Sequence, residues 1–429
     1  MSLSRDVEPH PPAEAAPRRR LVLLLAVGCG LTAANLYYAQ PLLSELRTSF
    51  GISEVAAGGL ITATQIGYAA GMLLLVPLGD RVENRRLVAV LLGVTTVALL
   101  VAGTAPTFPI LLAGALVSGV TSVVAQILVP FAAGLAPERL RGRIVGRVVG
   151  GLLIGVMLSR TLGSLLAEVA GWRTVYLTSA VLMAVLAVAL RTALPRRPVS
   201  TRASYGALLR STARLVRMHS VLRRRALYQS AMFGGFTAFW TSVPYLLTRP
   251  PFSYSQLGIG LFALVGAGGA TIAPLAGRWS DRGLGRPLTA VAFIVAVLAF
   301  GIAGLGRHSV ILLVVAAVLI DMAVQASFIF GQHSIYQLDP TARARLNSAY
   351  LATFFVGGAV GSQLGSLAYH AGGWIGLTLF GATLPVLALL GWSTERGQRG
   401  SGFMGKVARW RVSSAARTNS SLTKRRIRG

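Results

Sequence analysis

The chain has 429 residues, of which 54% are hydrophobic and only 13% are charged, and its mean hydropathy is +0.65. A soluble domain normally carries about 25% charged residues, so this composition excludes an ordinary soluble protein and indicates a membrane protein. The formal net charge of +28 would favour a nucleic-acid partner in a soluble protein. Here the basic residues are confined to particular loops, which argues against nucleic-acid binding.

Twelve apolar stretches follow one another along the chain, each long enough to cross the hydrocarbon core, which takes roughly 20 helical residues. They are too long and too unalternating for barrel strands, so we predict helices. The fold class expected is therefore an all-α membrane protein with twelve transmembrane helices. The predicted spans are 20–43, 55–78, 87–104, 109–135, 145–168, 173–192, 225–248, 256–277, 288–305, 309–335, 346–369 and 374–392.

Arginines gather in every second loop. By the positive-inside rule these loops and both termini are predicted to be cytoplasmic, in a multi-pass protein of the cell membrane. The alternate loops hold only Arg47, Arg173, Arg249 and Arg307, and the preference for arginine over lysine is typical of a bacterial source. The basic loops contain Arg18, Arg19 and Arg20; Arg81, Arg85 and Arg86; Arg139, Arg141 and Arg143; ten arginines from Arg191 to Arg225; Arg278, Arg282 and Arg286; and Arg343 and Arg345.

A short charged sequence occurs twice, after the second and the eighth predicted helix. The first copy reads Gly79-Asp80-Arg81-Val82-Glu83-Asn84-Arg85-Arg86, and the second reads Gly277-Arg278-Trp279-Ser280-Asp281-Arg282-Gly283-Leu284-Gly285-Arg286. Other residues recur at nearly the same interval, among them Gly155 with Gly357 and Trp172 with Trp374. The repeat predicts two six-helix bundles of equal topology, related by a pseudo-two-fold axis along the membrane normal.

The repeat and the composition divide the chain into five parts. Residues 193–224 could form an amphipathic helix on the anionic inner leaflet or a solvated basic linker, and both readings stay open. The parts are a cytoplasmic N-terminal segment 1–19, a first bundle 20–192, a basic linker 193–224, a second bundle 225–392 and a basic, disordered cytoplasmic tail 393–429.

Over residues 20–392 the sequence resembles the major facilitator superfamily, whose loop pattern is G-x-x-x-D-R-x-G-R-R. The first copy departs from the pattern because Val76 and Glu83 replace glycines, and in the second copy a glycine falls one place late, at Gly285. In this family the loop holds the two halves together on the cytoplasmic side and releases them as the transporter opens inward. The resemblance implies gating roles for Asp80, Arg81, Arg85, Arg86, Asp281, Arg282 and Arg286.

Two further segments resemble the exporter side of that superfamily. The fifth predicted helix carries Gly151, Gly155 and Gly163, as in drug and metabolite antiporters, although simple small-residue packing would also need these glycines. The glycine-proline pair of those antiporters is missing, and so is the arginine of their fourth helix. The segment 35–43 is similar to a little-characterised bacterial branch.

Two charged side chains lie deep within predicted helices, Arg160 in the fifth and Asp321 in the tenth. A charge at mid-bilayer costs about 2.5–3.5 kcal/mol on insertion scales, so such residues persist where they have a role or a partner. Their similar depth predicts an ion pair between the halves. This pair is either a proton-linked switch or a fixed structural contact.

The superfamily resemblance implies that helices 1, 4, 7 and 10 line a central cavity. Aromatic rings with a few amides suit amphipathic or cationic solutes, although Tyr and Trp also form interface belts. His333 could titrate near neutrality or act as a hydrogen-bonded structural residue. The candidate cavity residues are Asn35, Tyr37, Tyr38, Gln40, Gln126, Phe236, Phe239, Trp240, Gln325, Gln332 and His333.

The function expected is secondary active, proton-coupled export of small organic molecules by alternating access. The alternatives are a proton-coupled uptake symporter of the same fold and, less favoured, a membrane sensor or scaffold that uses the basic tail. No catalytic or metal-ligand motif is found, so we expect no enzyme activity, no metal and no cofactor. The expected partners are the lipid bilayer, a small-molecule substrate and protons, and the protein is expected to be a monomer.

Overall fold

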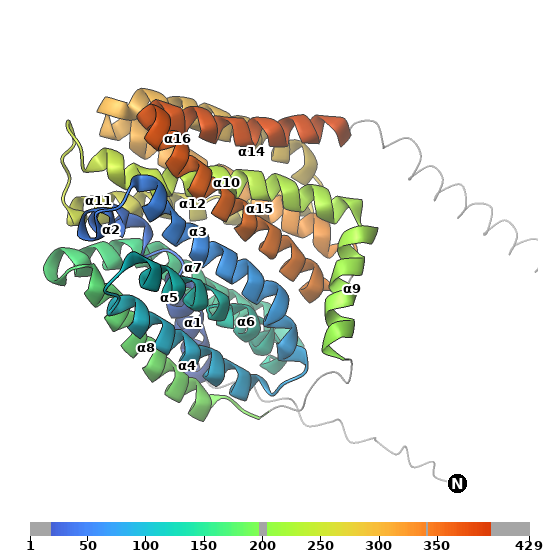
Figure 1. Cartoon of the computed structure of the whole chain (residues 1–429). Helices are drawn as coiled ribbons and strands as arrows, with labels where there is room; N and C mark the ends of the chain where they lie inside the picture. Colours follow the sequence, from blue (N-terminus) through green and yellow to red (C-terminus); the bar gives the residue numbers. More distant parts are fainter. Residues whose placement is uncertain (1–18, 197–203, 340–341, 396–429) are drawn as a thin grey trace, which may run out of the picture.

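The computed structural model describes residues 19–196, 204–339 and 342–395 (Figure 1). Within these ranges every regular element is helical. The first half contains α1 (Arg19–Ala34), α2 (Leu43–Phe50), α3 (Glu54–Leu74), α4 (Asn84–Gly103), α5 (Phe108–Thr121), α6 (Val124–Leu135), α7 (Glu138–Ala170) and α8 (Trp172–Ala193). After α9 (Tyr205–Met218), the second half contains α10 (Ser220–Leu247), α11 (Gln256–Ala263), α12 (Ala267–Ala270), α13 (Ala273–Asp281), α14 (Gly285–Leu305), α15 (Val310–Tyr336) and α16 (Arg343–Ser393).

Nine helical stretches of the described chain are long and apolar enough to cross a membrane. The remaining predicted spans are the interrupted α1–α2 stretch, the 28-residue α10, and the second arm of α16. The 51-residue α16 turns back at Gly372–Gly373, where Gly373 adopts a φ of +58° that favours glycine. The predicted all-helical membrane fold is therefore confirmed.

Three predicted spans differ from the expected continuous helices. The first is interrupted by turns between Ala34 and the short 3-10 helix Gln40–Leu42, and in that 3-10 helix Pro41 has no N–H to donate. The fourth breaks at Ser122–Val123, and the eighth divides into α11, α12 and α13 around a glycine-rich stretch. Such breaks in membrane helices are tolerated where other protein groups cover the backbone.

The two halves lie side by side, the first coloured blue to green and the second yellow to red (Figure 1). Helix α9 runs across one end of the molecule from one half toward the other. We call this end the arginine-rich end, since α3 finishes there near Asp80, α13 near Asp281, and α16 begins there at Arg343. The other end, called here the Glu54 end, holds the start of α3 and the Gly372–Gly373 turn.

Glycines bring the helices of each half into backbone contact. A Cβ on Gly155 of α7 would lie 2.2 Å from the backbone oxygen of Gly30 in α1. The repeat-related Gly357 of α16 would place a Cβ 2.2 Å from the backbone oxygen of Ser230 in α10. The same small-residue contact is therefore built into both halves at equivalent positions.

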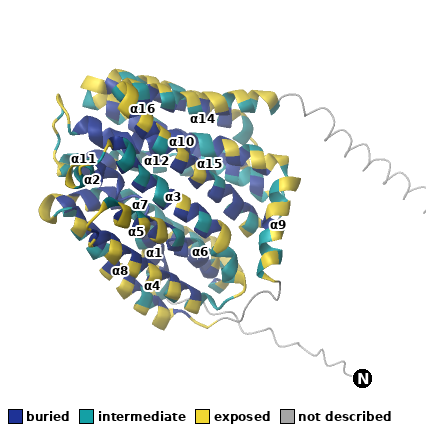
Figure 2. Ribbon diagram, viewed as in Figure 1, coloured by how far each residue is buried: buried dark blue, intermediate teal, exposed yellow. Residues whose placement is uncertain are grey.

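Large apolar side chains cover the outer faces of the helices, where exposed residues appear in yellow (Figure 2). Leu23 is 64% exposed, Leu298 61% and Leu379 64%. An apolar surface of this extent would be unfavourable in water, so these faces are the lipid-contacting surface of the bundle.

Candidate functional site

Side-chain to backbone hydrogen bonds join the halves toward the Glu54 end. Helix α3 packs along α16, where Ser362 Oγ donates to the Gly58 oxygen at 3.2 Å and Gln363 Nε2 donates to the Val55 oxygen at 3.3 Å. Helix α7 packs on α11, and Thr161 Oγ1 donates to the Gly260 oxygen at 2.8 Å. These bonds hold the two halves against each other on this side of the bundle.

Glu54 is the centre of a charge cluster at this end. Its Oε1 accepts from Arg47 Nη1 and from Arg249 Nη2, both at 2.9 Å, and its Oε2 lies 3.3 Å from His370 Nδ1. Arg47 belongs to the first half, whereas Arg249 and His370 belong to the second. The buried Glu54 carboxylate therefore connects the two halves.

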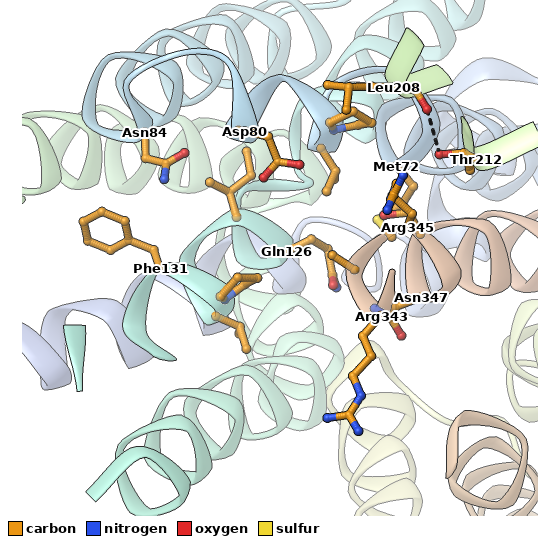
Figure 3. A pocket seen from close by; sticks show the side chains of 18 of the residues that line it. Met72, Asp80, Asn84, Gln126, Phe131, Leu208, Thr212, Arg343, Arg345 and Asn347 are labelled. Atoms are coloured by element: carbon orange, nitrogen blue, oxygen red, sulfur yellow. Dashed lines mark hydrogen bonds between the residues drawn. The ribbon is translucent and has the colours of Figure 1, made fainter. Parts of the chain in front are cut away.

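At the arginine-rich end the halves separate around a cavity of about 700 Å³ (Figure 3). Met72, Asp80 and Gln126 line it from the first half, and Arg345 and Asn347 line it from the second. Leu208 and Thr212 of α9 also line it, so α9 covers part of this cavity.

An aromatic layer lies between this cavity and the middle of the bundle. Tyr68 packs against Phe355 with ring centroids 4.4 Å apart, and Phe233 stacks on Phe354 at 3.7 Å. Met72 lies one helical turn nearer the arginine-rich end than Tyr68, and it lines the cavity. The protein is thus sealed toward the Glu54 end and hollow toward the other.

Arg160 is buried on the far side of the aromatic layer, at the boundary of the halves. Its Nε donates to Gln40 Oε1 at 2.8 Å. Its guanidinium carbon lies 4.5 Å from the ring centroid of Trp240, 5.2 Å from that of Tyr37 and 5.4 Å from that of Phe236. Three rings therefore stabilise this buried cation.

Asp321 is buried next to the same rings, on the second half. Its Oδ1 accepts from Trp240 Nε1 at 2.9 Å. Among the described residues no direct ion pair joins Asp321 to Arg160, and Gly266 lies against both side chains. Arg160 and Asp321, which the sequence predicts to pair, both contact the Trp240 ring but do not bond to each other directly in this conformation.

The other candidate cavity residues divide into two groups. Asn35 accepts from Ser179 Oγ at 2.7 Å, Tyr38 packs against Tyr176, and Phe239 packs against Trp374, so these three make contacts inside their own halves. Toward the arginine-rich end, Gln126 donates to Tyr68 at 3.2 Å, Gln332 donates to Asn347 at 2.9 Å, and Gln325 is half-buried on α15. Only Gln126 of the predicted set lines the 700 Å³ cavity.

The two copies of the charged loop have different surroundings. In the first, the positive charge of Arg345 from the opposite half acts on the Asp80 carboxylate. In the second, Asp281 lies 4.0 Å from His333 Nδ1 and Arg286 lies 3.6 Å from Glu395, both within the second half. Arg81, Arg86 and Arg282 are exposed, and Arg85 is half-buried.

Helix α9 contacts both halves. Tyr205 Oη donates to the Leu74 backbone oxygen at 2.7 Å, and Arg345 Nη1 donates to Ser211 Oγ at 3.0 Å. Leu215 and Val216 pack on the start of α10 and α16. The exposed face carries Arg210, Arg214 and Arg217. The segment for which the sequence left two readings open thus contains an amphipathic helix.

Sequence reasoning missed the Glu54 cluster and the role of Arg345. The signal available was the scarcity of arginine in the loops at the Glu54 end, where Arg47 and Arg249 stood out. Among the described residues no group of three or more His, Cys, Asp or Glu side chains could hold a metal ion.

Comparison with known proteins gives a consistent picture. The model of the Major Facilitator Superfamily matches residues 25–306. An uncharacterized transporter, YgaY of Escherichia coli O157:H7, is 41% identical over 87% of this chain and 94% of its own length. The probable transporter SCO4007 of Streptomyces coelicolor is 37% identical over 90% and 89% of the two chains.

More distant matches include a drug exporter and solved structures. A chloramphenicol efflux pump of Mycobacterium tuberculosis is 26% identical over 80% of this chain and 86% of its own. The crystal structure of a mutant of the nucleoside transporter NupG superposes with a TM-score of 0.72 over 87% of this chain and 99% of that chain, at 14% identity. At that identity the likeness to NupG establishes the fold alone.

Proposed function

Because the chain belongs to the Major Facilitator Superfamily, a family of membrane transporters and not of enzymes, we propose that this secondary transporter exports small organic molecules in exchange for protons. In this proposal the arginine-rich end faces the cytoplasm. The observation that carries it is the asymmetry between a sealed Glu54 end and a hollow arginine-rich end, with two opposite buried charges at the boundary of the halves.

Alternating access requires one end to close as the other opens. The present conformation is then inward-facing, with a 700 Å³ cavity open toward the cytoplasm. Closing that cavity would bring the Asp80 loop closer to Arg345, and opening the other end would separate Glu54 from Arg249 and His370. In each change, a few contacts that join the halves at one end are lost and a few at the other end are gained, as expected of an interface with two stable arrangements.

Proton coupling is assigned to Asp321. A carboxylate removed from water at the boundary of two moving halves changes its environment as they move, and so changes its affinity for a proton. Arg160 is the charged group that faces it, and Tyr37 is the titratable group that faces Arg160. Export is supported by the glycines of α7 and by the distant relation to an efflux pump.

The experiment starts from a thermal-shift screen of a broad panel of solutes on the purified protein. Hits are then followed in proteoliposomes with the inside and outside pH set independently. We expect substrate and proton to move in opposite directions, and Asp321→Asn to abolish the pH dependence. Glu168→Gln, at the Glu54 end of α7, is the matched acid control and should retain it.

Three outcomes would contradict the proposal in different ways. Movement of substrate and proton in the same direction would favour the uptake symporter. Unchanged flux and pH dependence in Asp321→Asn would remove the coupling role. Loss of a cellular phenotype on deleting the tail, with no flux through the remaining chain, would favour a sensor or scaffold.

A further inference from the structure

Two buried hydrogen-bond donors beside the aromatic rings have no acceptor in the described protein. They are Nη2 of Arg160, a residue only 4% exposed, and Nε2 of Gln40, a residue only 1% exposed. Both residues line a small cavity of about 10 Å³ together with Trp240. Buried donors are nearly always satisfied in native proteins, so two of them side by side indicate a missing acceptor.

The second half offers the opposite chemistry close by. Asp321 uses Oδ1 to accept from Trp240, whereas its Oδ2 accepts no hydrogen bond from any residue in the described ranges. A Cβ built on Gly266 would lie 2.7 Å from Asp321 Oδ2 and 3.4 Å from Arg160 Nη1. Asp321 Oδ2 and Arg160 Nη1 are therefore each within 3.4 Å of the same point beside Gly266. No nitrogen of Arg160 lies within 4.0 Å of an Asp321 oxygen, so the two residues do not form an ion pair.

We propose that this region binds a small zwitterion, an α-amino acid with an apolar side chain. Its carboxylate accepts from Arg160 and Gln40, and its ammonium donates to Asp321 Oδ2. The rings of Tyr37, Phe236 and Trp240 contact the apolar side chain. This inference rests on the proposed function and names its substrate class.

Charge balance favours a zwitterion over a simple ion. The site holds one buried cation, Arg160, and one buried anion, Asp321. A bound anion would pair only with Arg160 and a bound cation only with Asp321, which would leave the other charge without a ligand partner away from water, whereas a zwitterion pairs with both. Before binding, Asp321 carries a proton. The ammonium competes with that proton for the same Asp321 oxygen, so binding of the amino acid releases the proton to water and leaves Asp321 ionised, which gives exchange.

The position of the site connects binding to movement of the halves. Gln40 and Arg160 belong to the first half, and Asp321 and Trp240 belong to the second. A ligand bonded to both draws the halves together around itself. The present cavity of about 10 Å³ has space for no more than about one water, so the site widens when the halves rearrange.

The test uses the full chain in proteoliposomes containing a pH-sensitive dye and two sets of matched probes. One set is L-phenylalanine, L-phenylalaninamide and 3-phenylpropionate; the other is L-leucine, L-leucinamide and 4-methylpentanoate. We expect at least one of the two amino acids to drive proton movement opposite to its own. The amide of that amino acid, which lacks the carboxylate, and the corresponding acid without the amino group should each drive proton movement at least tenfold less.

Other outcomes overturn the zwitterion and leave transport to be judged separately. A response to the amides alone would indicate a cation site at Asp321, and a response to the acids alone would indicate an anion site at Arg160. No response to all six probes, with coupled flux of another solute from the broad panel, rejects the zwitterion but retains proton-coupled transport. No coupled flux of any solute rejects the proposed function itself.

A variant pair assigns the carboxylate contact. Gln40→Leu removes one donor and keeps both charges, so the KM for the amino acid should rise about tenfold while proton exchange remains coupled. Gln256→Leu, at the Glu54 end and outside the site, is the matched control and should keep the wild-type KM. Equal KM values for the two variants would remove Gln40 from the site.

Discussion

The two ends of the bundle join the halves by different means. At the Glu54 end, one buried carboxylate contacts Arg249 and His370 of the opposite half, and hydrogen bonds along α3 and α16 add to it. At the arginine-rich end, Asp80 and Arg345 attract each other through their charges, and both line a large cavity. The first end is closed by packing and charge together, whereas the second is connected mainly by charge and by α9.

This difference indicates which end controls which step. Packed contacts must be disrupted to open the Glu54 end, so substitutions there should change the conformational balance strongly. Contacts of exposed charges are screened by water and contribute about 0–1 kcal/mol, so substitutions at the arginine-rich end should have smaller effects.

The largest effect is expected for Gly58→Leu. A Cβ on Gly58 would lie 2.1 Å from Ser366 Oγ, so a leucine would prevent α3 and α16 from closing. Transport should fall more than tenfold, and spin labels across the Glu54 end should report a longer distance. Gly59→Leu is the control, since its Cβ would meet only Gln363 Oε1 at 3.8 Å. Equal effects of the two variants would show that packing does not close this end.

Some of this architecture could be predicted from the sequence because it follows from local rules. Gly155 and Gly357 recur at the interval of the repeat, and they mark the same backbone contact in each half. Arg160 and Asp321 stood out because charges are rare inside membrane helices. Such features need no knowledge of the tertiary partners.

The remaining contacts depend on residues far apart in the chain. Glu54 sits in the first turn of a helix, where an acid is ordinary, and its partners Arg249 and His370 are 195 and 316 residues away. The family resemblance implied a gating role for Asp80 without naming a partner in the opposite half, and the structure shows that the charge of Arg345 from that half acts on it. Only the folded chain shows these pairs.

A smaller effect is expected for Glu54→Gln. The variant loses both arginine ion pairs, whose arginine side chains are 39% and 54% exposed, so the equilibrium should move about fivefold toward opening of the Glu54 end. Labelling of a single cysteine introduced near Ser362 in a Cys29→Ser background measures this shift. Glu45→Gln is the control, because Glu45 accepts from the Trp172 backbone within its own half. A labelling rate equal to that of the wild type would contradict a closing role for Glu54.

A change of two- to threefold is expected for Asp80→Asn. Loss of the attraction to Arg345 should favour the conformation that is open at the arginine-rich end, and Arg345→Gln should do the same. The double variant should resemble either single variant, because both remove one interaction. Asp281→Asn should have less effect, since its partner His333 is in the same half and the Asp281 side chain is 78% exposed. Distances between spin labels at the arginine-rich end measure these shifts. Additive effects of the two substitutions in the double variant would contradict a direct interaction between Asp80 and Arg345.

The smallest effect concerns α9. Tyr205→Phe removes the hydrogen bond to the Leu74 backbone, a single bond at a partly exposed position, and keeps the ring. We expect less than a twofold change in transport, together with faster hydrogen exchange of the α9 amides, because α9 then loses a direct bond to the first half. Tyr254→Phe, in the loop before α11 at the Glu54 end, is the matched control and should leave α9 exchange unchanged. If Tyr205→Phe leaves α9 exchange at the wild-type rate, α9 is retained by its contacts with the second half, namely Ser211 with Arg345 and the packing of Leu215 and Val216.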